Sequence, residues 1–201
     1  TKGVLSFTSS VIQKELFADD YVYEVKMKRK YEINANSLLF HGYPAPLGSS
    51  GYWDDAYVFQ YANDSYWSLY KLVDGVSIPI IEWTYSNSIK PYDWNTLTVY
   101  TDYPHLDFWI NGQYVGCTGP DCGLPETTYD AGWVGLGMYK GATEKSPLLV
   151  DYAKLKYTHT PPYPWPWGFT ADGKRVLVDT TFEFPAPASG IGQDIDHSSG
   201  E

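Results

Sequence analysis

Carboxyl side chains are the first candidates for chemistry, because two of them about 5 Å apart can hydrolyse a glycosidic bond with retention. Acidic residues that alternate along one face of a strand would supply this separation. The glutamates are instead scattered, for example at Glu24, Glu82, Glu126, Glu144 and Glu183. Asp54 and Asp55 are adjacent, so a strand would point them to opposite faces. The four histidines complete no nucleophile–base–acid arrangement. The sequence therefore predicts that the chain is not an enzyme.

Aromatic rings beside polar side chains would support a different chemistry, the binding of carbohydrates. A ring can pack against the apolar face of a sugar while nearby polar groups hydrogen-bond its hydroxyls. The stretch "GYWDDAY" has this composition and supplies the candidate residues Trp53, Asp54, Asp55 and Tyr57. Aromatic residues are also favoured in strands and sandwich cores, so for Trp53 a binding role and a packing role both stay open. Trp67 and Trp109 lie within predicted strands, where packing is the favoured interpretation.

The two cysteines, Cys117 and Cys122, enclose "TGPD", in which Gly119-Pro120 favours a turn. A zinc site normally needs four ligands, and no histidine lies within ten residues of this pair. We therefore expect a disulfide that contributes about 2 kcal/mol and indicates an oxidising, extracellular location. The sequon that begins at Asn63 is compatible with this location and predicts a glycosylation site.

Composition sets the broad class of the protein. With 201 residues, of which 43% are hydrophobic, the chain is long enough for one domain with its own core. Its net charge of −10 disfavours binding to nucleic acids and to anionic membranes. The basic residues from Lys26 to Lys30 alternate with apolar ones, which is typical of a solvated strand face. No segment approaches the roughly 18 apolar residues of a membrane span.

Short strands are predicted along most of the chain, and no helix is. Alternating or β-rich segments occur at 21–29, 56–62, 66–73, 95–101, 105–110, 113–115, 132–139 and 148–157. Asn63-Asp64 and Asn111-Gly112 are turn-forming pairs, and the second is a strong hairpin signal. This spacing predicts an all-β fold, an antiparallel sandwich of two sheets.

The segments "YVYEVKMK", "YWSLYKLVDG", "WNTLTVYTDYPHLDFWINGQYVG", "YDAGWVGLGMY" and "LLVDYAKLKY" resemble the concanavalin A-like lectin/glucanase superfamily, including its laminin-G-like modules. The resemblance implies a jelly roll of two curved antiparallel sheets over residues 1–158, with functions that range from sugar binding to hydrolysis and adhesion. The Glu-x-Asp-x-Glu strand of the family's glucanases has no counterpart here. By position, Asp151 matches an aspartate that helps to hold a structural calcium ion in some relatives. Calcium needs six to eight oxygens, so an Asp that merely ends a strand face is an equal alternative.

The C-terminal part carries an additional strand signal. A spacer rich in proline and tryptophan at 159–173 precedes the segment 174–201, in which one apolar-leaning face comprises Val176, Val178, Thr180, Phe182 and Phe184. The resemblance also implies a first strand that this chain lacks before residue 3. The extra strand is therefore expected to fill either its own sandwich or that of a neighbouring copy. The stiff spacer favours donation to a neighbour, which would build a head-to-tail filament.

Two functions follow from these observations. The favoured prediction is a non-catalytic, extracellular structural subunit that polymerises with copies of itself by strand donation. The alternative is a carbohydrate-binding, lectin-like module of a secreted or cell-surface protein. The two are compatible. Apart from a possible structural calcium, no cofactor is predicted.

Overall fold

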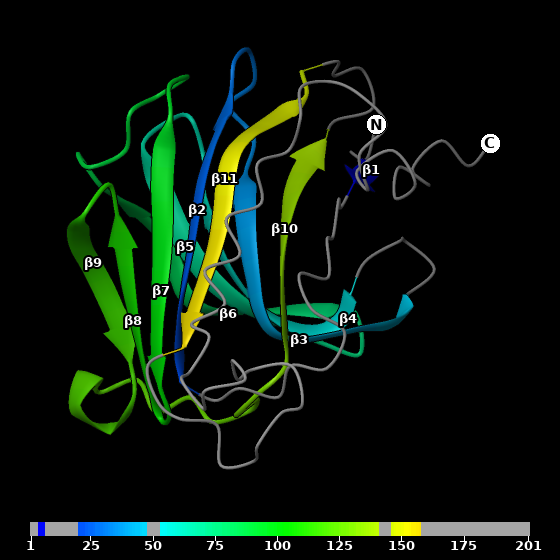
Figure 1. The fold of residues 1–201 in the computed structure, drawn as a ribbon, viewed down its shortest axis with the longest axis vertical. Coiled ribbons are helices and arrows are strands. Elements are labelled where there is room, and N and C mark those ends of the chain that lie inside the picture. Colours follow the sequence, from blue (N-terminus) through cyan, green and yellow to red (C-terminus); the bar gives the residue numbers. More distant parts are fainter. Residues whose placement is uncertain (1–3, 7–19, 48–52, 141–145, 158–201) are drawn as a thin grey trace, which may run out of the picture.

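The computed structural model describes residues 4–6, 20–47, 53–140 and 146–157, which form an antiparallel β-sandwich (Figure 1). The strands are β1 (Val4–Ser6), β2 (Tyr21–Arg29), β3 (Asn36–Leu47), β4 (Trp53–Tyr61), β5 (Tyr66–Val73), β6 (Val76–Tyr85), β7 (Asn95–Asp102), β8 (His105–Ile110), β9 (Gln113–Thr118), β10 (Trp133–Lys140) and β11 (Leu148–Tyr157). One sheet has six strands in the order β1-β10-β3-β4-β5-β6, and the other has five in the order β11-β2-β7-β8-β9. The predicted all-β jelly roll of two sheets is confirmed.

Hydrophobic alternation predicted several strands to the residue. In β2 the side chains of Tyr21, Tyr23, Val25 and Met27 are buried, and those between them are half-buried. The bounds of β5, β8 and β11 also match the sequence segments. Two long strands, β3 and β6, were not predicted. Leu38, Leu39 and Phe40 are all buried and so show no alternation, and β6 is an edge strand that tolerates a proline.

Two turns hold neighbouring strands in register. Asn111 and Gly112 connect β8 to β9 with φ values of 52° and 76°, the left-handed conformations that a tight hairpin requires. The Asn111 side chain also accepts a hydrogen bond from the Thr96 amide at 2.9 Å and donates one to the Ser88 carbonyl at 2.7 Å. At the predicted Asn63-Asp64 turn, the Ala62 amide donates to the Tyr66 carbonyl at 2.8 Å. Both predicted turns are confirmed.

Aromatic side chains fill the space between the sheets. The ring of Phe59 lies 5.1 Å from Phe108 of the facing sheet and 5.7 Å from Trp67. This main core therefore joins the two sheets. A second apolar cluster belongs to the other face of the six-stranded sheet and consists of Leu39, Trp53, Ala56, Val58 and Leu72, with Tyr70 and Trp133 packed against it. The six-stranded sheet thus buries apolar residues on both faces.

Cys117 and Cys122 form a disulfide around the short 3₁₀ turn η1 (Pro120–Cys122), as predicted. The predicted spacer at 159–173 and the candidate donor strand at 174–201, with Val176, Val178, Thr180, Phe182 and Phe184, lie outside the described residues. Within the described ranges, no helix is long and apolar enough to cross a membrane.

Candidate functional site

A groove with a volume of about 600 Å³ is the candidate functional site. Its wall includes the loop residues Ile33, Asn34 and Ala35, which connect β2 to β3. Side chains from β3, β4, β5, β6 and β10 complete it. Because these five strands are neighbours in the six-stranded sheet, the groove runs across that sheet and its position is fixed by the strand register.

A row of three polar side chains crosses the groove. Ser37 of β3 pairs with Gln60 of β4, and Gln60 pairs with Ser68 of β5. The Gln60 amide nitrogen donates to the Ser68 hydroxyl at 2.8 Å, and the Ser37 hydroxyl donates to the Gln60 carbonyl oxygen at 3.5 Å. All three residues are largely buried, with 3–8% of their surface exposed, and they line the groove. Two hydroxyls therefore fix the orientation of the Gln60 amide, while their remaining hydrogen-bonding capacity is available to a ligand.

Aromatic rings border this polar row. Tyr66 of β5 is 40% exposed, and Trp83 of β6 is 45% exposed. Tyr66 also lies edge-on to Tyr85, with the ring centroids 5.8 Å apart. Tyr70 is half-buried, and burial raises the pKa of its phenol, so the group stays protonated at physiological pH. The groove thus combines apolar ring surfaces with neutral hydrogen-bonding groups.

The charge of the groove is negative. Asp64 and Glu82 both line it and are exposed. The Asp64 carboxylate accepts a hydrogen bond from the Tyr66 amide at 3.3 Å, which places it at the β4–β5 turn. Among the described residues that line the groove, none is Lys, Arg or His. A neutral or cationic ligand therefore fits this groove better than an anionic one.

The predicted sugar-binding cluster occupies a different place. Trp53 and Tyr57 have no exposed surface, so neither can act as the ring platform that the sequence suggested. A Cβ added at Gly42 or Gly135 would lie 2.3 Å or 2.7 Å from the nearest ring atom of Trp53. The indole is therefore packed directly against the backbone of β3 and β10. For Trp53 the packing role, one of the two interpretations left open, is the one that the structure supports.

Two of the predicted residues, Tyr57 and Asp55, take part in a polar network around Glu126, named here the Glu126 network. The Tyr57 hydroxyl donates to Glu126 at 3.0 Å, and the Lys71 ammonium forms an ion pair with the same carboxylate at 2.9 Å. Asp55 accepts a hydrogen bond from the Tyr129 hydroxyl at 2.7 Å. Asp54 is half-buried next to the β5–β6 turn, where its carbonyl accepts from the Gly75 amide at 2.8 Å. The Glu126 network thus attaches the segment around residues 126–129 to β4 and β5.

Replacing Glu126 with glutamine should lower the stability of the fold in a pH-dependent way. Burial raises the pKa of Glu126, but hydrogen bonds from Thr128, Lys71 and Tyr57 outweigh it and hold the pKa below its usual value. A carboxyl group with a lowered pKa in the folded state stabilises the fold above its unfolded pKa, and the contribution is lost as the pH falls through the folded value. We expect Glu126→Gln to lose about 2 kcal/mol of unfolding free energy at about pH 7.

Urea denaturation of both proteins at several pH values will measure this difference. The gap should narrow as the pH falls below the usual pKa of a glutamate and through the lowered pKa of Glu126 in the folded state, because the native carboxyl then becomes neutral. Glu82→Gln, which changes an exposed carboxyl, serves as the control and should leave the unfolding free energy within about 0.5 kcal/mol. A Glu126→Gln protein as stable as the native one at neutral pH would contradict the prediction.

The remaining predicted site residues have defined partners. The Asp151 carboxylate lies 2.6 Å from the Lys26 ammonium, and no group of three or more His, Cys, Asp or Glu side chains among the described residues could hold a metal. Calcium binding at Asp151 stays a prediction. Asn63 is 2% exposed, and its amide nitrogen donates to the carbonyls of Arg29 and Glu32. In this conformation the nitrogen that would carry a glycan stabilises the fold, and glycosylation at Asn63 also stays a prediction.

Sequence analysis missed Gln60 and Ser68, although a signal for them exists. Gln60 interrupts the apolar run "AYVFQYA", and Ser68 interrupts "YWSLY". With the turn at Asn63-Asp64, the two polar positions fall opposite each other in a hairpin. Ser37 could not be found in this way, because β3 shows no alternation.

Comparisons with known proteins give matches among solved structures. No protein-family model and no curated protein matches the chain. The carbohydrate-binding module CBM66 from Bacillus subtilis matches with a TM-score of 0.54 at 12% identity, over 77% of this chain and 91% of that one. A glycosidic hydrolase matches with a TM-score of 0.51 at 17% identity, over 75% of this chain and 69% of the hydrolase chain. A human galectin-16 variant matches with a TM-score of 0.51 at 8% identity, over 76% of this chain and 99% of the galectin chain.

Likeness at these identities concerns the fold and not the activity. One of the three is named as a carbohydrate-binding module, one as a glycosidic hydrolase and one as a galectin. All three match at least 75% of this chain, which has the two-sheet arrangement that the sequence resemblance implied. The chain therefore shares the jelly-roll fold of these structures, the fold that its resemblance to the concanavalin A-like lectin/glucanase superfamily implied.

Proposed function

We propose that the chain is a non-catalytic, extracellular carbohydrate-binding module that holds a neutral glycan in the groove of the six-stranded sheet. The observation that carries the proposal is the hydrogen-bonded row of Ser37, Gln60 and Ser68, bordered by the rings of Tyr66 and Trp83. The rings supply apolar surface for the C–H face of a sugar, and the row supplies fixed donors and acceptors for its hydroxyls. The printed names of CBM66 and of the galectin support a lectin-like role, and the disulfide supports an extracellular location.

Removing the Trp83 ring should weaken glycan binding without unfolding the protein. Trp83 is 45% exposed on an edge strand, so Trp83→Ala removes a ligand surface and little of the core. We expect about a fivefold loss of affinity for a neutral oligosaccharide that a glycan array has identified. Tyr92→Ala is the matched control, because Tyr92 is also 45% exposed and does not line the groove.

Isothermal titration calorimetry will measure both variants, and chromatography of the glycan afterwards will show whether it has been cleaved. Equal losses in Trp83→Ala and Tyr92→Ala would place the site elsewhere. Release of shorter sugars would contradict the non-catalytic part of the proposal.

The charge of the groove should discriminate between neutral and acidic glycans. Each of the carboxylates of Asp64 and Glu82 would repel an anion about 6 Å away by about 0.7 kcal/mol in water. The two repulsion energies together correspond to about a tenfold higher affinity for a neutral oligosaccharide than for its uronic-acid counterpart at low ionic strength. The preference should disappear at about 1 M salt, where the screening length is about 3 Å. An acidic glycan that binds better than the neutral one at low salt would contradict this.

Filament assembly by strand donation remains a separate prediction. Its donor residues, such as Phe182 and Phe184, lie outside the described part of the chain, and the comparisons offer it no support. Glycan binding in the groove does not depend on it, because the groove is built from β3, β4, β5, β6, β10 and the loop before β3.

A further inference from the structure

We propose a second carbohydrate-binding surface on the outer face of the five-stranded sheet, centred on Trp109 and Tyr114, which takes a single sugar residue. It is distinct from the groove, because the two aromatic residues lie on β8 and β9, which contribute no residue to the groove. We call it the Trp109 surface. It consists of Trp109, Tyr114, Tyr100, Asp107 and Thr98.

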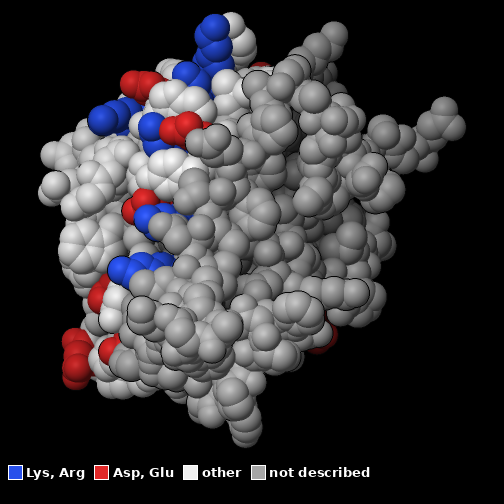
Figure 2. Space-filling view, viewed as in Figure 1, with Lys and Arg blue, Asp and Glu red and all other residues white. Residues whose placement is uncertain are grey.

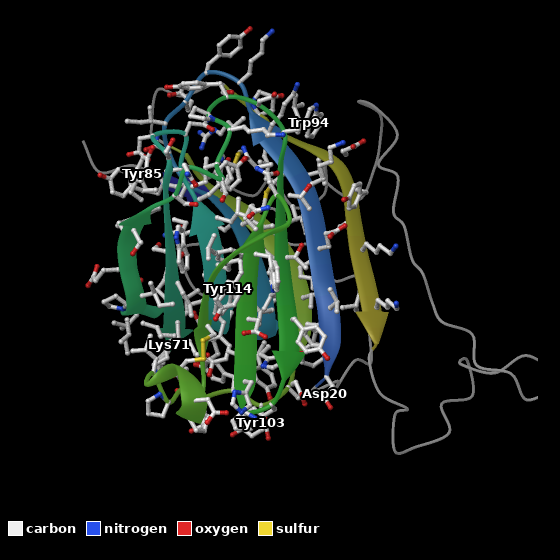
Figure 3. All side chains as sticks on the ribbon, turned by 90° about the vertical axis from the view of Figure 1, so that its left-hand side faces the viewer. Asp20, Lys71, Tyr85, Trp94, Tyr103 and Tyr114 are labelled. Carbon is white, nitrogen blue, oxygen red and sulfur yellow. A yellow bond between two sulfur atoms is a disulfide. The ribbon has the colours of Figure 1, made fainter. Side chains whose placement is uncertain are left out.

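Strand register places these side chains together. Thr98 of β7 pairs with Trp109 of β8, which pairs with Tyr114 of β9. The next outward row along the same strands pairs Tyr100 with Asp107. Within β8 the residues on either side of Trp109, Phe108 and Ile110, are fully buried in the core, so Trp109 points away from it. Figure 3 views the molecule with β6 at the left and β2 and β11 at the right, and shows the Tyr114 side chain on β9 between them.

The two rings form a corner that is open to solvent. Their centroids are 5.4 Å apart and their planes meet at 74°, and Trp109 and Tyr114 are 37% and 51% exposed. The predicted packing role for Trp109 is therefore only partly met, because more than a third of the side chain remains accessible. A tryptophan or tyrosine with one accessible ring face offers apolar surface at little cost in conformational entropy.

Polar groups lie beside this corner. Asp107 lies two residues before Trp109 on β8 and therefore on the same face of the sheet. Burial and then the charge of Asp107 raise the pKa of the Tyr114 phenol. The Thr98 hydroxyl donates to the Glu24 carboxylate at 3.1 Å, so its position next to Trp109 is fixed. A carboxylate accepts hydrogen bonds from sugar hydroxyls, and a threonine hydroxyl can both donate and accept them. The Trp109 surface thus repeats the combination of rings and oxygen atoms found in the groove.

The size of the surface favours a sugar over a protein partner. Two aromatic side chains bury about 150–250 Å² each when fully covered, and both rings here are already partly covered. A stable protein interface needs about 800 Å² on each partner. Towards β2 and β11 the same face carries alternating charges, including Glu24, Lys26 and Lys154, which Figure 2 shows as interspersed red and blue. Charges of this kind are depleted in the cores of protein interfaces, whereas a single sugar ring needs only the aromatic corner.

A second site on the opposite sheet would make one chain bivalent. The groove and the Trp109 surface belong to different sheets of the sandwich, so two glycan chains could be held at the same time. Such a monomer would cross-link a polysaccharide with many sites, although neither site alone could do so.

The test uses the full chain, a panel of neutral oligosaccharides of different linkage, and isothermal titration calorimetry. The variants are Trp109→Ala, Gln60→Leu and the double variant, with Tyr92→Ala as an exposed-ring control. We expect the titration to give a stoichiometry of two glycans per chain for the native protein, one for each single variant and no binding for the double variant. Turbidity on mixing with a neutral polysaccharide should appear only with the native chain and Tyr92→Ala.

Other outcomes separate this inference from the proposed function. Binding that survives Gln60→Leu and is lost in Trp109→Ala would support the Trp109 surface and contradict the groove. A stoichiometry that Trp109→Ala leaves unchanged, or no binding to any glycan of the panel, would overturn the inference. A fall in the light-scattering mass of the glycan-free protein on Trp109→Ala would also overturn it, because the surface would then be a contact between copies of the chain.

Discussion

Gly42→Ala should destabilise the protein by at least about 3 kcal/mol, one of the largest effects on stability that we expect from a single substitution. An added Cβ would lie 2.3 Å from the ring of Trp53 and 2.9 Å from the Cβ of Ala56. The ring cannot move aside easily, because a Cβ at Gly135 would also lie 2.7 Å from it and the indole is completely buried. The thermal midpoint should fall by about 6–12 °C for a domain of this size.

Combining Gly42→Ala with Trp53→Ala will show whether this contact is the cause. Trp53→Ala alone should cost about 3–5 kcal/mol, because it leaves a large cavity. In that background most of the Gly42→Ala penalty should disappear, giving a coupling energy of about 2 kcal/mol between the two sites. Additive effects in the double variant would show that the Gly42 penalty has another origin.

Gly112→Ala is the control for replacing a glycine as such. A Cβ added at Gly112 would meet no heavy atom within 4 Å beyond its neighbours in the chain, and the φ of this residue is +76°. Alanine at this hairpin position should therefore cost only the backbone strain, about 1 kcal/mol. Thermal unfolding followed by circular dichroism will compare the variants. If Gly112→Ala were as damaging as Gly42→Ala, the steric argument for Gly42 would fail.

The role of Trp53 illustrates what local sequence reasoning can and cannot predict. The segment "GYWDDAY" has the composition of an exposed binding loop, and nothing in it shows that the indole is covered. Its burial depends on Gly42 and Gly135, which are distant in the sequence and approach it only after β10, β3 and β4 have paired. Strand β2, in contrast, was predicted to the residue, because alternation is a property of neighbouring positions.

The two proposed binding surfaces also differ in how much of each could be predicted from the sequence. Gln60 and Ser68 belong to one hairpin, so their pairing could have been deduced from the turn at Asn63-Asp64. The exposure of Trp109 could not, because a tryptophan in a strand is accessible or covered according to what lies over that face of the sheet. The Asn111-Gly112 turn was visible in the sequence and fixes the pairing of Trp109 with Tyr114. The pairing of these strands could thus be predicted from the turns, whereas the exposure of the Trp109 side chain could be known only from the complete fold.

Gln60→Leu should weaken binding of the groove's glycan at least about thirtyfold, or about 2 kcal/mol, the largest effect on binding that we expect. Leucine has a similar size but cannot hydrogen-bond. The substitution removes the partner of the Ser68 hydroxyl at 2.8 Å and that of the Ser37 hydroxyl at 3.5 Å. A bound sugar would then cover hydroxyls that have lost their partner, and each unsatisfied group costs about 1–3 kcal/mol.

Two measurements separate a binding role from a structural one. In the absence of glycan Gln60→Leu leaves two largely buried hydroxyls without their partner, so we expect it to lower the unfolding free energy by about 1–3 kcal/mol while the protein still folds. Ser77→Ala, an exposed groove residue outside the row, is the matched control and should bind within about twofold of the native chain. Calorimetric titration of the same glycan into both variants, with urea denaturation alongside, will give the two quantities. A Gln60→Leu protein that is stably folded and binds the glycan at the native affinity would show that the row does not contact the ligand.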